Sequence, residues 1–503
     1  MTAVQTAADT VDLRALMASV DVVAPAAQLT DITANSVQAG PGALFLACNG
    51  FKHHGLEFVD EALAKNVAAV VWEPAEGIAV PEFPAGIVNL RVPELGDKVG
   101  GIAHRFFNAP SEALAITAIT GTNGKTTTAW LAAQALETLG RVSGYMGTLG
   151  FGVGERFQPS ALTTPGVISV HRRLREMADM GADTVVMEVS SHGIDQGRID
   201  AVRISVAAFT NLSRDHLDYH GSLEAYAATK ARLFLDTDLD TAVINVGDRF
   251  GAQLSTRLPA SVATITVALH DEMYRSESQP DITAELLAAD GDGLHIRLCG
   301  SYGEVFMRSR LWGRFNSENL LVAVGVLVAH GYSLEESVAA LEGCAAPAGR
   351  MQLIRSGEQQ PRVVVDFAHT PDALENVLKA LRGHCSGQLW CIFGCGGDRD
   401  AGKRAEMGAI ATELADQVII TDDNPRHEDP REIVRQILAG TGTAEVRVEH
   451  DRARAIQDAI KDAAAGDVVL IAGKGSESVQ IVGDSAHEFS DAAVATQALG
   501  QAT

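Results

Sequence analysis

The sequence is poor in features that mark secreted, zinc-ribbon and nucleic-acid-binding proteins. Six of its 503 residues are cysteine and no two of them form a CxxC pair, so neither a disulfide scaffold nor a zinc knuckle is expected. Basic residues are outnumbered, with 40 Lys and Arg against 64 Asp and Glu and a formal net charge of −24. Because such a charge repels phosphate backbones and anionic lipid, we expect neither a nucleic-acid partner nor a membrane partner.

Long apolar runs and targeting signals are also missing from the sequence. The longest strongly apolar stretch, residues 320–330, is too short to cross a bilayer. Residues 1–9 carry neither a basic cluster nor an apolar core, so we expect no signal peptide. These absences predict a cytoplasmic protein that acts on small molecules, and we expect it to be a monomer.

Short apolar runs alternate with helical patterns over most of the chain, which is typical of βαβ units and parallel sheets. The length allows three domains of about 150 residues each. We predict an α/β protein with a smaller N-terminal α/β domain over 1–110, a central P-loop-type ATPase domain with a parallel sheet over 111–346, and a C-terminal Rossmann-like domain over 347–503. Key strands are predicted at 114–119, 184–187, 206–210, 242–245, 363–365, 389–393, 418–420, 446–448 and 468–471, with a hairpin around 290–293.

The most informative motif is a glycine-rich turn between a predicted strand and a predicted helix. It consists of Gly121, Thr122, Asn123, Gly124, Lys125, Thr126 and Thr127. Glycines let a backbone close around phosphate, Lys125 can neutralise phosphate charge, and the Thr126 hydroxyl can face Mg²⁺. The spacing is shorter than that of the usual P-loop, because Ile119 stands where the first glycine would be. The alternative is a simple turn with a surface lysine, which the strand–turn–helix context disfavours.

Two further segments carry candidate metal ligands. Glu188 directly follows the predicted strand 184–187. The loop 211–220 contains two histidines and two aspartates within six residues, of which His216 is the best placed. Carboxylate and hydroxyl oxygens suit a hard cation such as Mg²⁺. Taken singly, each segment could be a solvated polar loop, but beside a P-loop the metal interpretation is favoured.

Several ordered motifs together resemble one family over nearly the whole chain. They are TTP at 163–165, EVSSHG from Glu188, FTNLSRDHLDYHG from Phe209, GRFN at 313–316, DFAHTPDAL from Asp366, GCGGDRDAGKR from Gly394 and DNPR at 423–426, in addition to GTNGKTT from Gly121. Through these motifs the sequence resembles the Mur ligases, which are ATP-dependent amide-forming enzymes of peptidoglycan synthesis. Within that family it is most similar to the members that add 2,6-diaminopimelate.

The resemblance implies a role for each domain and for named residues. Lys125, Lys230 and His216 would be catalytic. Thr126 and Glu188 would hold one Mg²⁺, while His216 and an N-carbamoylated Lys230 would serve a second. ATP, as co-substrate, would contact Gly121, Thr122, Asn123, Gly124, Lys125, Thr126, Thr127, Asn316, Asn319, Arg350, Asp366 and His369. The UDP-muramoyl dipeptide would contact Ser36, Thr163, Thr164, Ser190, Gln196 and Arg198. Diaminopimelate would contact Arg399, Asp423, Asn424, Pro425, Arg426, Gly473 and Glu477.

The sequence departs from the family pattern at several positions. Asn35-Ser36-Val37 stands where Asp-Ser-Arg is usual, the loop 50–55 diverges, Ala348 stands for proline, and Ser476 stands for histidine. Without the resemblance, Lys230 would be read as an ordinary exposed lysine. The acidic cluster of Asp484, Glu488 and Asp491 is predicted to be a solvated surface.

The reaction implied is attack of a substrate carboxylate on the γ-phosphate of ATP, followed by attack of an amine on the acyl phosphate. Three alternatives stay open at this point. One is the same ligation with L-lysine, and another is a ligase similar to folylpolyglutamate synthase. The third belongs to a different class, a P-loop NTPase switch in which hydrolysis drives motion.

Overall fold

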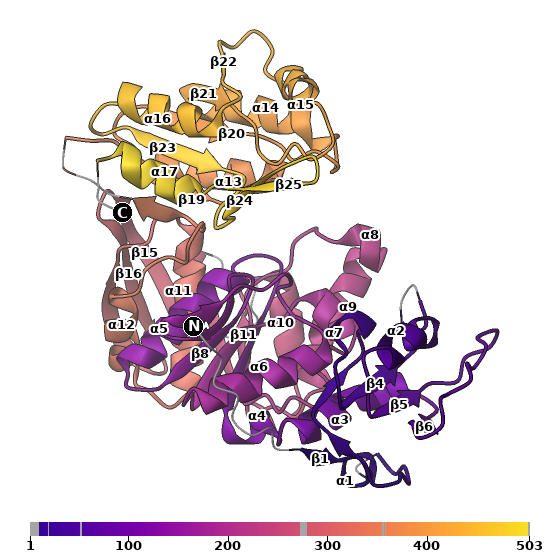
Figure 1. Ribbon diagram of the computed structural model, residues 1–503. Coiled ribbons are helices and arrows are strands. Elements are labelled where there is room, and N and C mark those ends of the chain that lie inside the picture. The colour runs from indigo at the N-terminus through magenta and orange to yellow at the C-terminus, as the bar shows by residue number, and fades with distance from the viewer. Residues whose placement is uncertain are drawn as a thin grey trace.

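The computed structural model describes residues 10–18, 20–50, 53–271, 279–354, 357 and 359–500. Residues 1–9, on which the signal-peptide prediction rests, lie outside this part. Figure 1 shows three successive parts of the chain, N-terminal in indigo, central from purple through magenta to salmon, and C-terminal in orange to yellow. Within the described residues no helix is both long and apolar enough to span a bilayer.

The N-terminal part is a small α/β unit. A parallel four-stranded sheet has the order β3-β4-β5-β6, and β1 and β2 form a separate antiparallel pair. Along β4, Leu44 and Leu46 pack into one hydrophobic cluster while Ala43, Phe45 and Ala47 pack into another, because successive side chains of a strand point to opposite faces. The elements are β1 (Val11–Asp12), α1 (Leu13–Ala18), β2 (Gln28–Leu29), β3 (Asp31–Thr33), η1 (Ser36–Gln38), β4 (Ala43–Ala47), η2 (Gly55–Phe58), α2 (Val59–Leu63), β5 (Ala69–Trp72), β6 (Val88–Arg91) and α3 (Leu95–Phe106).

The central part is built on an eleven-stranded sheet with the order β10-β9-β8-β11-β7-β12-β13-β14-β15-β16-β17. Its strands are β7 (Ala115–Thr120), β8 (Ser143–Gly147), β9 (Gly150–Val153), β10 (Arg156–Gln158), β11 (Thr184–Glu188), β12 (Val206–Phe209), β13 (Thr241–Asn245), β14 (Ala263–Leu269), β15 (Ile282–Asp290), β16 (Gly293–Gly300) and β17 (Gly303–Ser309). The predicted parallel sheet is confirmed from β8 to β15, whereas β9, β10, β16 and β17 pair antiparallel at the edges.

Helices cover both faces of this sheet and the order of its strands creates the site. The helices are α4 (Pro110–Ala113), α5 (Lys125–Thr138), α6 (Val167–Asp179), α7 (Ser191–Asp195), α8 (Leu217–His220), α9 (Leu223–Leu235), α10 (Arg249–Ser255), α11 (Phe315–Ala329) and α12 (Leu334–Glu342). The first strand of the sheet, β7, lies between β11 and β12. The chain runs from β7 to β8 on one side of β7, and after β11 it crosses to β12 on the other side. The strand order therefore reverses at β7, and the carboxyl end at such a point is where α/β proteins bind ligands.

The C-terminal part is a second α/β unit with the sheet order β18-β19-β23-β20-β21-β22, parallel except for β18. The elements are β18 (Gln352–Ile354), β19 (Arg362–Asp366), α13 (Pro371–Arg382), β20 (Leu389–Phe393), α14 (Lys403–Leu414), β21 (Gln417–Ile420), α15 (Pro430–Leu438), β22 (Arg447–Val448), α16 (Arg452–Asp462), β23 (Val468–Ala472), β24 (Val479–Val482), β25 (Ser485–Glu488) and α17 (Asp491–Ala498). Apart from the separate hairpin β24–β25, it has the doubly wound arrangement that the sequence predicts.

One prediction about this part is wrong, because Asp491 is not a solvated residue. Its side chain and that of Arg452 are both fully buried and form a two-pronged ion pair, with Nε donating to Oδ1 at 2.7 Å and Nη2 to Oδ2 at 2.8 Å. The pair joins α16 to α17 across 39 residues of sequence. Asp484 is almost fully exposed and Glu488 is exposed, as predicted.

Trp312 ties the central part to the C-terminal part. It precedes α11 yet belongs to the hydrophobic cluster of the C-terminal sheet, and its ring stacks on His384 with centroids 4.7 Å apart. The Gly313 backbone N–H donates to His384 Nε2 at 3.0 Å. The core of the C-terminal part thus includes a residue well before the predicted limit at 346/347.

Candidate active site

The glycine-rich turn sits at the carboxyl end of β7 and is braced by the loop after β12. The backbone N–H of Thr122 donates to Asn211 O at 2.8 Å, and that of Asn123 donates to Asn211 Oδ1 at 2.9 Å. Gly121 and Gly124 have positive φ. A Cβ at Gly121 would lie 1.9 Å from Thr210 Oγ1, and one at Gly124 would lie 2.1 Å from Asn319 Oδ1. Both glycines are required by backbone conformation and by close neighbours.

Lys125 begins α5 and folds back over this turn. Its Nζ donates to the carbonyl oxygens of Gly121 at 3.0 Å and Thr122 at 2.8 Å. Burial lowers the pKa of Lys125, the Glu188 carboxylate opposes that shift, and the Arg350 guanidinium adds to it. The ammonium is therefore held where a bound phosphate would meet it, together with the N-terminal N–H groups of α5.

Thr126 and Glu188, which the resemblance assigns to one Mg²⁺, are hydrogen-bonded to each other. Thr126 Oγ1 donates to Glu188 Oε2 at 2.8 Å, and the carboxylate is 1% exposed. Glu188 Oε1 accepts from Tyr145 Oη at 2.6 Å and from the Thr148 N–H at 2.8 Å. A buried carboxylate beside a hydroxyl is a suitable pair of oxygen ligands for Mg²⁺. Over the described residues no group of three or more His, Cys, Asp and Glu could hold a metal, so a Mg²⁺ here would also need nucleotide phosphate or water.

Lys230 is not an ordinary exposed lysine, since it is 1% exposed and lies beneath the glycine-rich turn. Its Nζ donates to Gly121 O at 2.8 Å, the same oxygen that Lys125 contacts. It also lies 4.5 Å from the centre of the Tyr226 ring, one helical turn earlier on α9. Burial and the charge of Lys125 hold the pKa of Lys230 well below its usual value. The amine is thus unfavourable as a cation in this position.

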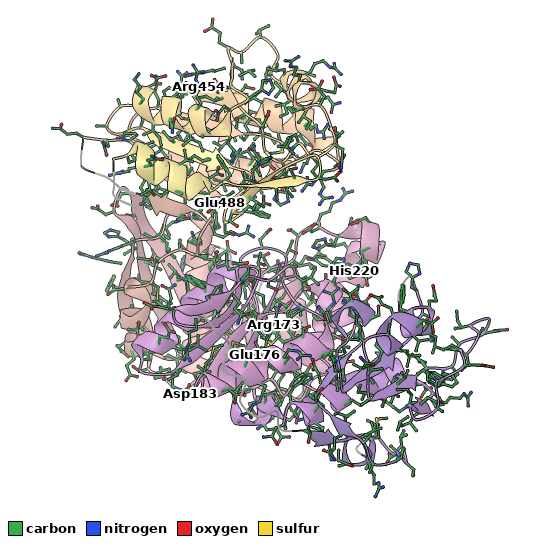
Figure 2. All side chains as sticks on the ribbon, viewed as in Figure 1. Arg173, Glu176, Asp183, His220, Arg454 and Glu488 are labelled. Atoms are coloured by element: carbon green, nitrogen blue, oxygen red, sulfur yellow. The ribbon has the colours of Figure 1, made fainter. Side chains whose placement is uncertain are left out.

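His216 lies at the start of α8 among several aromatic rings. Its backbone has φ 51° and its Nε2 is 3.5 Å from Asp215 Oδ2. The ring of His192 is 4.9 Å from that of His216 and 4.1 Å from that of Tyr219. The His220 ring is 5.6 Å from that of His192. In Figure 2, His220 lies on the side of the central part that faces the C-terminal part. Sequence reasoning did not single out His192, Tyr219 or His220, although all three stand inside quoted motifs.

The residues predicted for the muramoyl peptide gather beside Glu188. Thr164 Oγ1 donates to Glu188 O at 3.0 Å and accepts from the Ser190 N–H at 3.0 Å. Arg198 Nη1 donates to Thr164 O at 2.7 Å, and its Nε donates to Gln196 Oε1 at 3.1 Å. Thr163 and Thr148 share a hydrogen bond of 3.0 Å between their hydroxyls. Five of the six predicted residues therefore form one continuous cluster.

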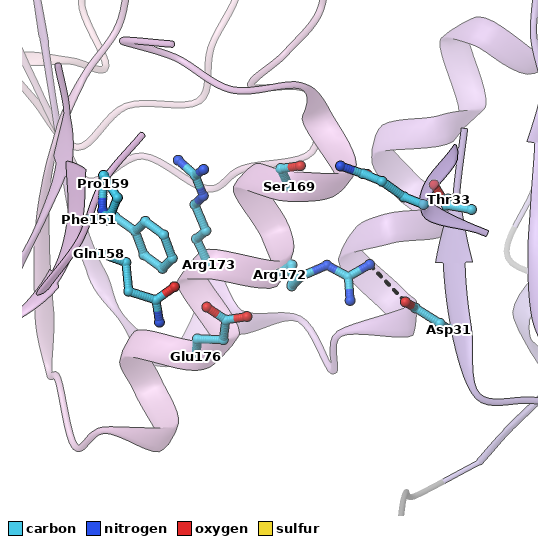
Figure 3. A pocket seen from close by; sticks show the side chains of 10 residues that line it. Asp31, Thr33, Phe151, Gln158, Pro159, Ser169, Arg172, Arg173 and Glu176 are labelled. Atoms are coloured by element: carbon cyan, nitrogen blue, oxygen red, sulfur yellow. Dashed lines mark hydrogen bonds and ion pairs between the residues drawn. The ribbon is translucent and has the colours of Figure 1, made fainter. Parts of the chain in front are cut away.

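The sixth, Ser36, lies in the N-terminal part, where its Oγ donates to Glu61 Oε2 at 2.7 Å. A cavity of about 360 Å³ lies between that part and α6 (Figure 3). In it Arg172 Nη2 is 2.7 Å from Asp31 Oδ1, an ion pair that joins α6 to β3, and the Arg173 guanidinium lies 4.3 Å from the centre of the Phe151 ring. None of the predicted substrate residues lines this cavity.

The remaining residues predicted for ATP come from α11 and from the start of the C-terminal part. Asn319 Nδ2 donates to Asn316 Oδ1 at 2.8 Å, and Thr128 Oγ1 donates to Asn319 Oδ1 at 3.4 Å, so this pair reaches α5. Asp366 is buried and accepts from the backbone N–H groups of Met351 at 2.7 Å and Ala368 at 2.8 Å.

Arg350 and His369 both lie close to the Phe367 ring. The Arg350 guanidinium is 4.5 Å from the centre of the Phe367 ring, and the His369 ring centre is 4.6 Å from it. Burial is the main cause that lowers the pKa of His369.

The residues predicted for diaminopimelate meet at the carboxyl ends of β20, β21 and β23. Asn424 Nδ2 donates to Glu477 Oε2 at 2.8 Å, and Arg426 Nη1 donates to Gly397 O at 2.8 Å. A Cβ at Gly396 would lie 3.0 Å from Arg426 Nη1 and 3.7 Å from Arg399 Cγ, so the two arginines flank one glycine. A Cβ at Gly473 would lie 2.7 Å from Asp423 Oδ2. Lys474, which the sequence analysis did not select, contacts both Asn424 and Glu477.

Comparison with known proteins agrees with this geometry. Residues 28–106 match "Mur ligase family, catalytic domain", residues 119–327 match "Mur ligase middle domain", and residues 349–475 match "Mur ligase, glutamate ligase domain". The chain is 44% identical over 474 residues to a UDP-N-acetylmuramoyl-L-alanyl-D-glutamate–2,6-diaminopimelate ligase of Xylella fastidiosa strain Temecula1, with 94% of each chain covered. It is 46% identical over 476 residues to the protein of that name from Ectopseudomonas mendocina, covering 94% of this chain and 95% of the relative.

A solved structure carrying the same name superimposes with a TM-score of 0.71 at 34% identity, covering 98% of this chain and 99% of that one. Identity above 30% over nearly the full length of both chains indicates common descent as well as a common fold. The chain belongs to the Mur ligase family.

Proposed function

We propose that this protein is an ATP-dependent ligase that joins meso-2,6-diaminopimelate to UDP-N-acetylmuramoyl-L-alanyl-D-glutamate. One observation carries the proposal: Glu188 links two predicted sites. Its carboxylate accepts from Thr126 of the phosphate-binding turn, and its backbone oxygen accepts from Thr164 of the muramoyl-peptide cluster. A γ-phosphate and a substrate carboxylate bound at these two places would be neighbours, as carboxylate phosphorylation requires.

The first step is attack of the dipeptide carboxylate on the γ-phosphorus of ATP, which gives an acyl phosphate and ADP. Two anions must approach each other, so the main task of the site is to reduce their repulsion. Lys125 and the N-terminal N–H groups of α5 supply fixed positive charge and donors for this purpose. A Mg²⁺ held by Thr126 and Glu188 would add further neutralisation when bound.

The second step is attack of the diaminopimelate amine on the acyl carbon, with loss of phosphate and of one proton from the amine. Asn424, Arg426 and Glu477, at the strand ends of the C-terminal sheet, would hold the amino acid. Because the carboxylate is itself the nucleophile of the first step, no Ser or Cys nucleophile is needed, and each thiol can be structural. Burial raises the pKa of both Cys391 and Cys395 to about 12, which keeps these two unreactive.

Lys230 is proposed to be carbamoylated on Nζ. The neutral amine that CO₂ requires is favoured by burial and by the nearby Lys125 ammonium. Addition of CO₂ with loss of a proton replaces a potential cation by an anion. That anion would lie beside Lys125 and could support a second Mg²⁺ together with His216.

We further propose domain limits at 110/111 and 346/347, a cytoplasmic location and a monomeric state. The partners are the three small-molecule substrates. The monomeric state is checked by light scattering of the purified chain.

The test of the proposed function is an amino-acid panel with ATP and the UDP-muramoyl dipeptide, read by mass spectrometry of the product. We expect addition of meso-diaminopimelate and sustained ADP release only when all three substrates are present, because without the amine the acyl phosphate is not consumed and turnover stops after the first step. A folylpolyglutamate synthase-like enzyme would require a folate acceptor instead. A P-loop switch would release ADP without either co-substrate, which would contradict the proposal.

Arg426→Ala is expected to lower kcat/KM for meso-diaminopimelate by about tenfold to a hundredfold. It should also narrow the enzyme's preference for meso-diaminopimelate over L-lysine. Diaminopimelate has a carboxylate at its far end that lysine lacks, and a guanidinium can bind a carboxylate through two N–H groups. Bonds to charged groups of about 1.5–3 kcal/mol give this range. The change adds no backbone strain of its own, because Arg426 is already a non-glycine residue at φ 49°.

The measurement is a competition assay between the two amino acids, with Arg431→Ala as the matched control, since Arg431 is an exposed arginine on nearby α15. If the unmodified enzyme prefers L-lysine, the substrate assignment is wrong while the ligase assignment stands.

A further inference from the structure

Lys474 is a fully buried lysine that the proposed reaction leaves without a role. It follows β23 and is 0% exposed. Its Nζ donates to Asn424 Oδ1 at 3.0 Å, to Glu477 Oε2 at 3.0 Å and to Val479 O at 2.7 Å. An ammonium group has three N–H donors, so all of them are used. The buried charge is compensated by the carboxylate of Glu477.

These bonds fix which way the Asn424 amide faces. Its Oδ1 accepts from Lys474 and from the Ile481 N–H at 2.9 Å, so its Nδ2 must face Glu477 Oε2, at 2.8 Å. Glu477 Oε2 therefore accepts two hydrogen bonds, one from Asn424 Nδ2 and one from Lys474 Nζ. The Glu477 side chain is 38% exposed, so the carboxylate stays accessible and could still bind the amino group of an amino acid.

Lys474 also anchors the hairpin β24–β25 through Val479, the first residue of β24. Further along that hairpin, the Arg426 N–H donates to Ile481 O at 3.1 Å and the Gly483 N–H donates to Arg426 O at 2.7 Å. Gln480 Nε2 donates to Asp423 O at 2.8 Å. The hairpin thus holds the backbone of the loop that carries Arg426, and Lys474 holds the start of the hairpin.

We propose that Lys474 is a positioning residue of the amino-acid pocket, whose ammonium orients Glu477 and Asn424 and anchors the hairpin that holds Arg426. The inference deepens the proposed function and rests on it for the identity of the amino acid. Lys474 touches no substrate in this arrangement. Lys474 affects the reaction only by positioning Glu477 and the hairpin. A change at Lys474 should therefore weaken binding of the amino acid and leave ATP binding unchanged.

The test is a double-mutant cycle of Lys474→Met and Glu477→Gln, with KM measured separately for each substrate. We expect Lys474→Met to raise KM for diaminopimelate about tenfold or more, while KM for ATP and for the UDP-muramoyl dipeptide changes less than twofold. In the Glu477→Gln background the same change should have little further effect, because interacting residues are not additive. Additive effects, or an equal rise in all three KM values, would overturn the proposal.

A second readout does not depend on the reaction. Hydrogen exchange of the Ile481 and Gly483 amides should be faster in Lys474→Met than in the unmodified protein, since the anchor of the hairpin is lost. Lys461→Met, a change at an exposed lysine of α16, is the control for both measurements.

Lys474→Arg keeps the positive charge. It should therefore retain part of the protection of the Ile481 and Gly483 amides from exchange and part of the affinity for diaminopimelate. A failure of both Lys474 variants to fold would show a role in stability alone and would overturn the proposal. If the unmodified protein adds no diaminopimelate, the proposed function fails, but the exchange experiment still decides whether Lys474 anchors the hairpin.

Discussion

Lys125→Ala is expected to reduce ADP release by a factor of about 10² to 10³ or more, because the variant loses the fixed cation that faces the transferred phosphate. The Lys125 ammonium lies over the glycine-rich turn, bonded to the carbonyl oxygens of Gly121 and Thr122. No other part of the turn supplies positive charge at that place except the partial charge of the α5 N-terminus. The variant should therefore lose mainly kcat, while KM for the UDP-muramoyl dipeptide and KM for diaminopimelate should change less.

The fold should survive this change. The turn is shaped by its glycines and by the Asn211 contacts rather than by the lysine side chain. Coupled-enzyme detection of ADP and thermal melting measure the two effects, with Lys461→Ala as a control for loss of an exposed lysine. Turnover close to that of the unmodified enzyme would show that the ATP site is assigned wrongly.

Lys230→Ala is the second change with a large expected effect, a loss of about a hundredfold or more in turnover. If Lys230 carries a carbamate, the variant loses an anion next to Lys125 and the proposed support of a second Mg²⁺. Short carboxylic acids such as acetate or formate should restore part of the activity, because they can enter the space left by the side chain and replace the anion. Bicarbonate should not, because the amine that captures CO₂ is gone.

The pH dependence of the modification follows from the shifted pKa of Lys230. Only the neutral amine reacts with CO₂, and burial together with Lys125 keeps that form available below the usual pKa of a lysine. Mass spectrometry of the intact protein and a crystal structure of the active enzyme both report the modification. An unmodified Lys230 in a fully active enzyme would contradict this prediction, and Lys125→Ala serves as a comparison that acetate should not rescue.

Much of the architecture could be predicted from the sequence because its signals are local. The apolar run 114–119, the two glycines and the following helix are all contained within about 25 residues, and the structure has β7, the turn and α5 at these places. The strands predicted at 389–393 and 418–420 likewise match β20 and β21 within one residue. An apolar run flanked by turn residues can be recognised without knowing what packs against it.

The environment of individual polar residues could not be predicted in this way. Asp491 was expected to be solvated, yet its partner Arg452 is 39 residues away and the pair is buried only because α16 and α17 pack together. Lys230 lies in an ordinary helical sequence, and its burial depends on α9 lying under a turn that is 109 residues away. A spacing of four residues between Tyr226 and Lys230 was the one local signal that they share a helical face.

The sequence by itself determined the succession of strands and helices, the glycines of the glycine-rich turn and the set of motif residues, since each depends on neighbours within one or two elements. Only the tertiary structure decided that β7 lies between β11 and β12, so that Thr126, Glu188 and Thr164 meet, and that Lys474 joins Asn424, Glu477 and the hairpin β24–β25. The physical reason is that strand order and helix packing are set by burial of apolar surface over the whole chain, which no short stretch of sequence specifies.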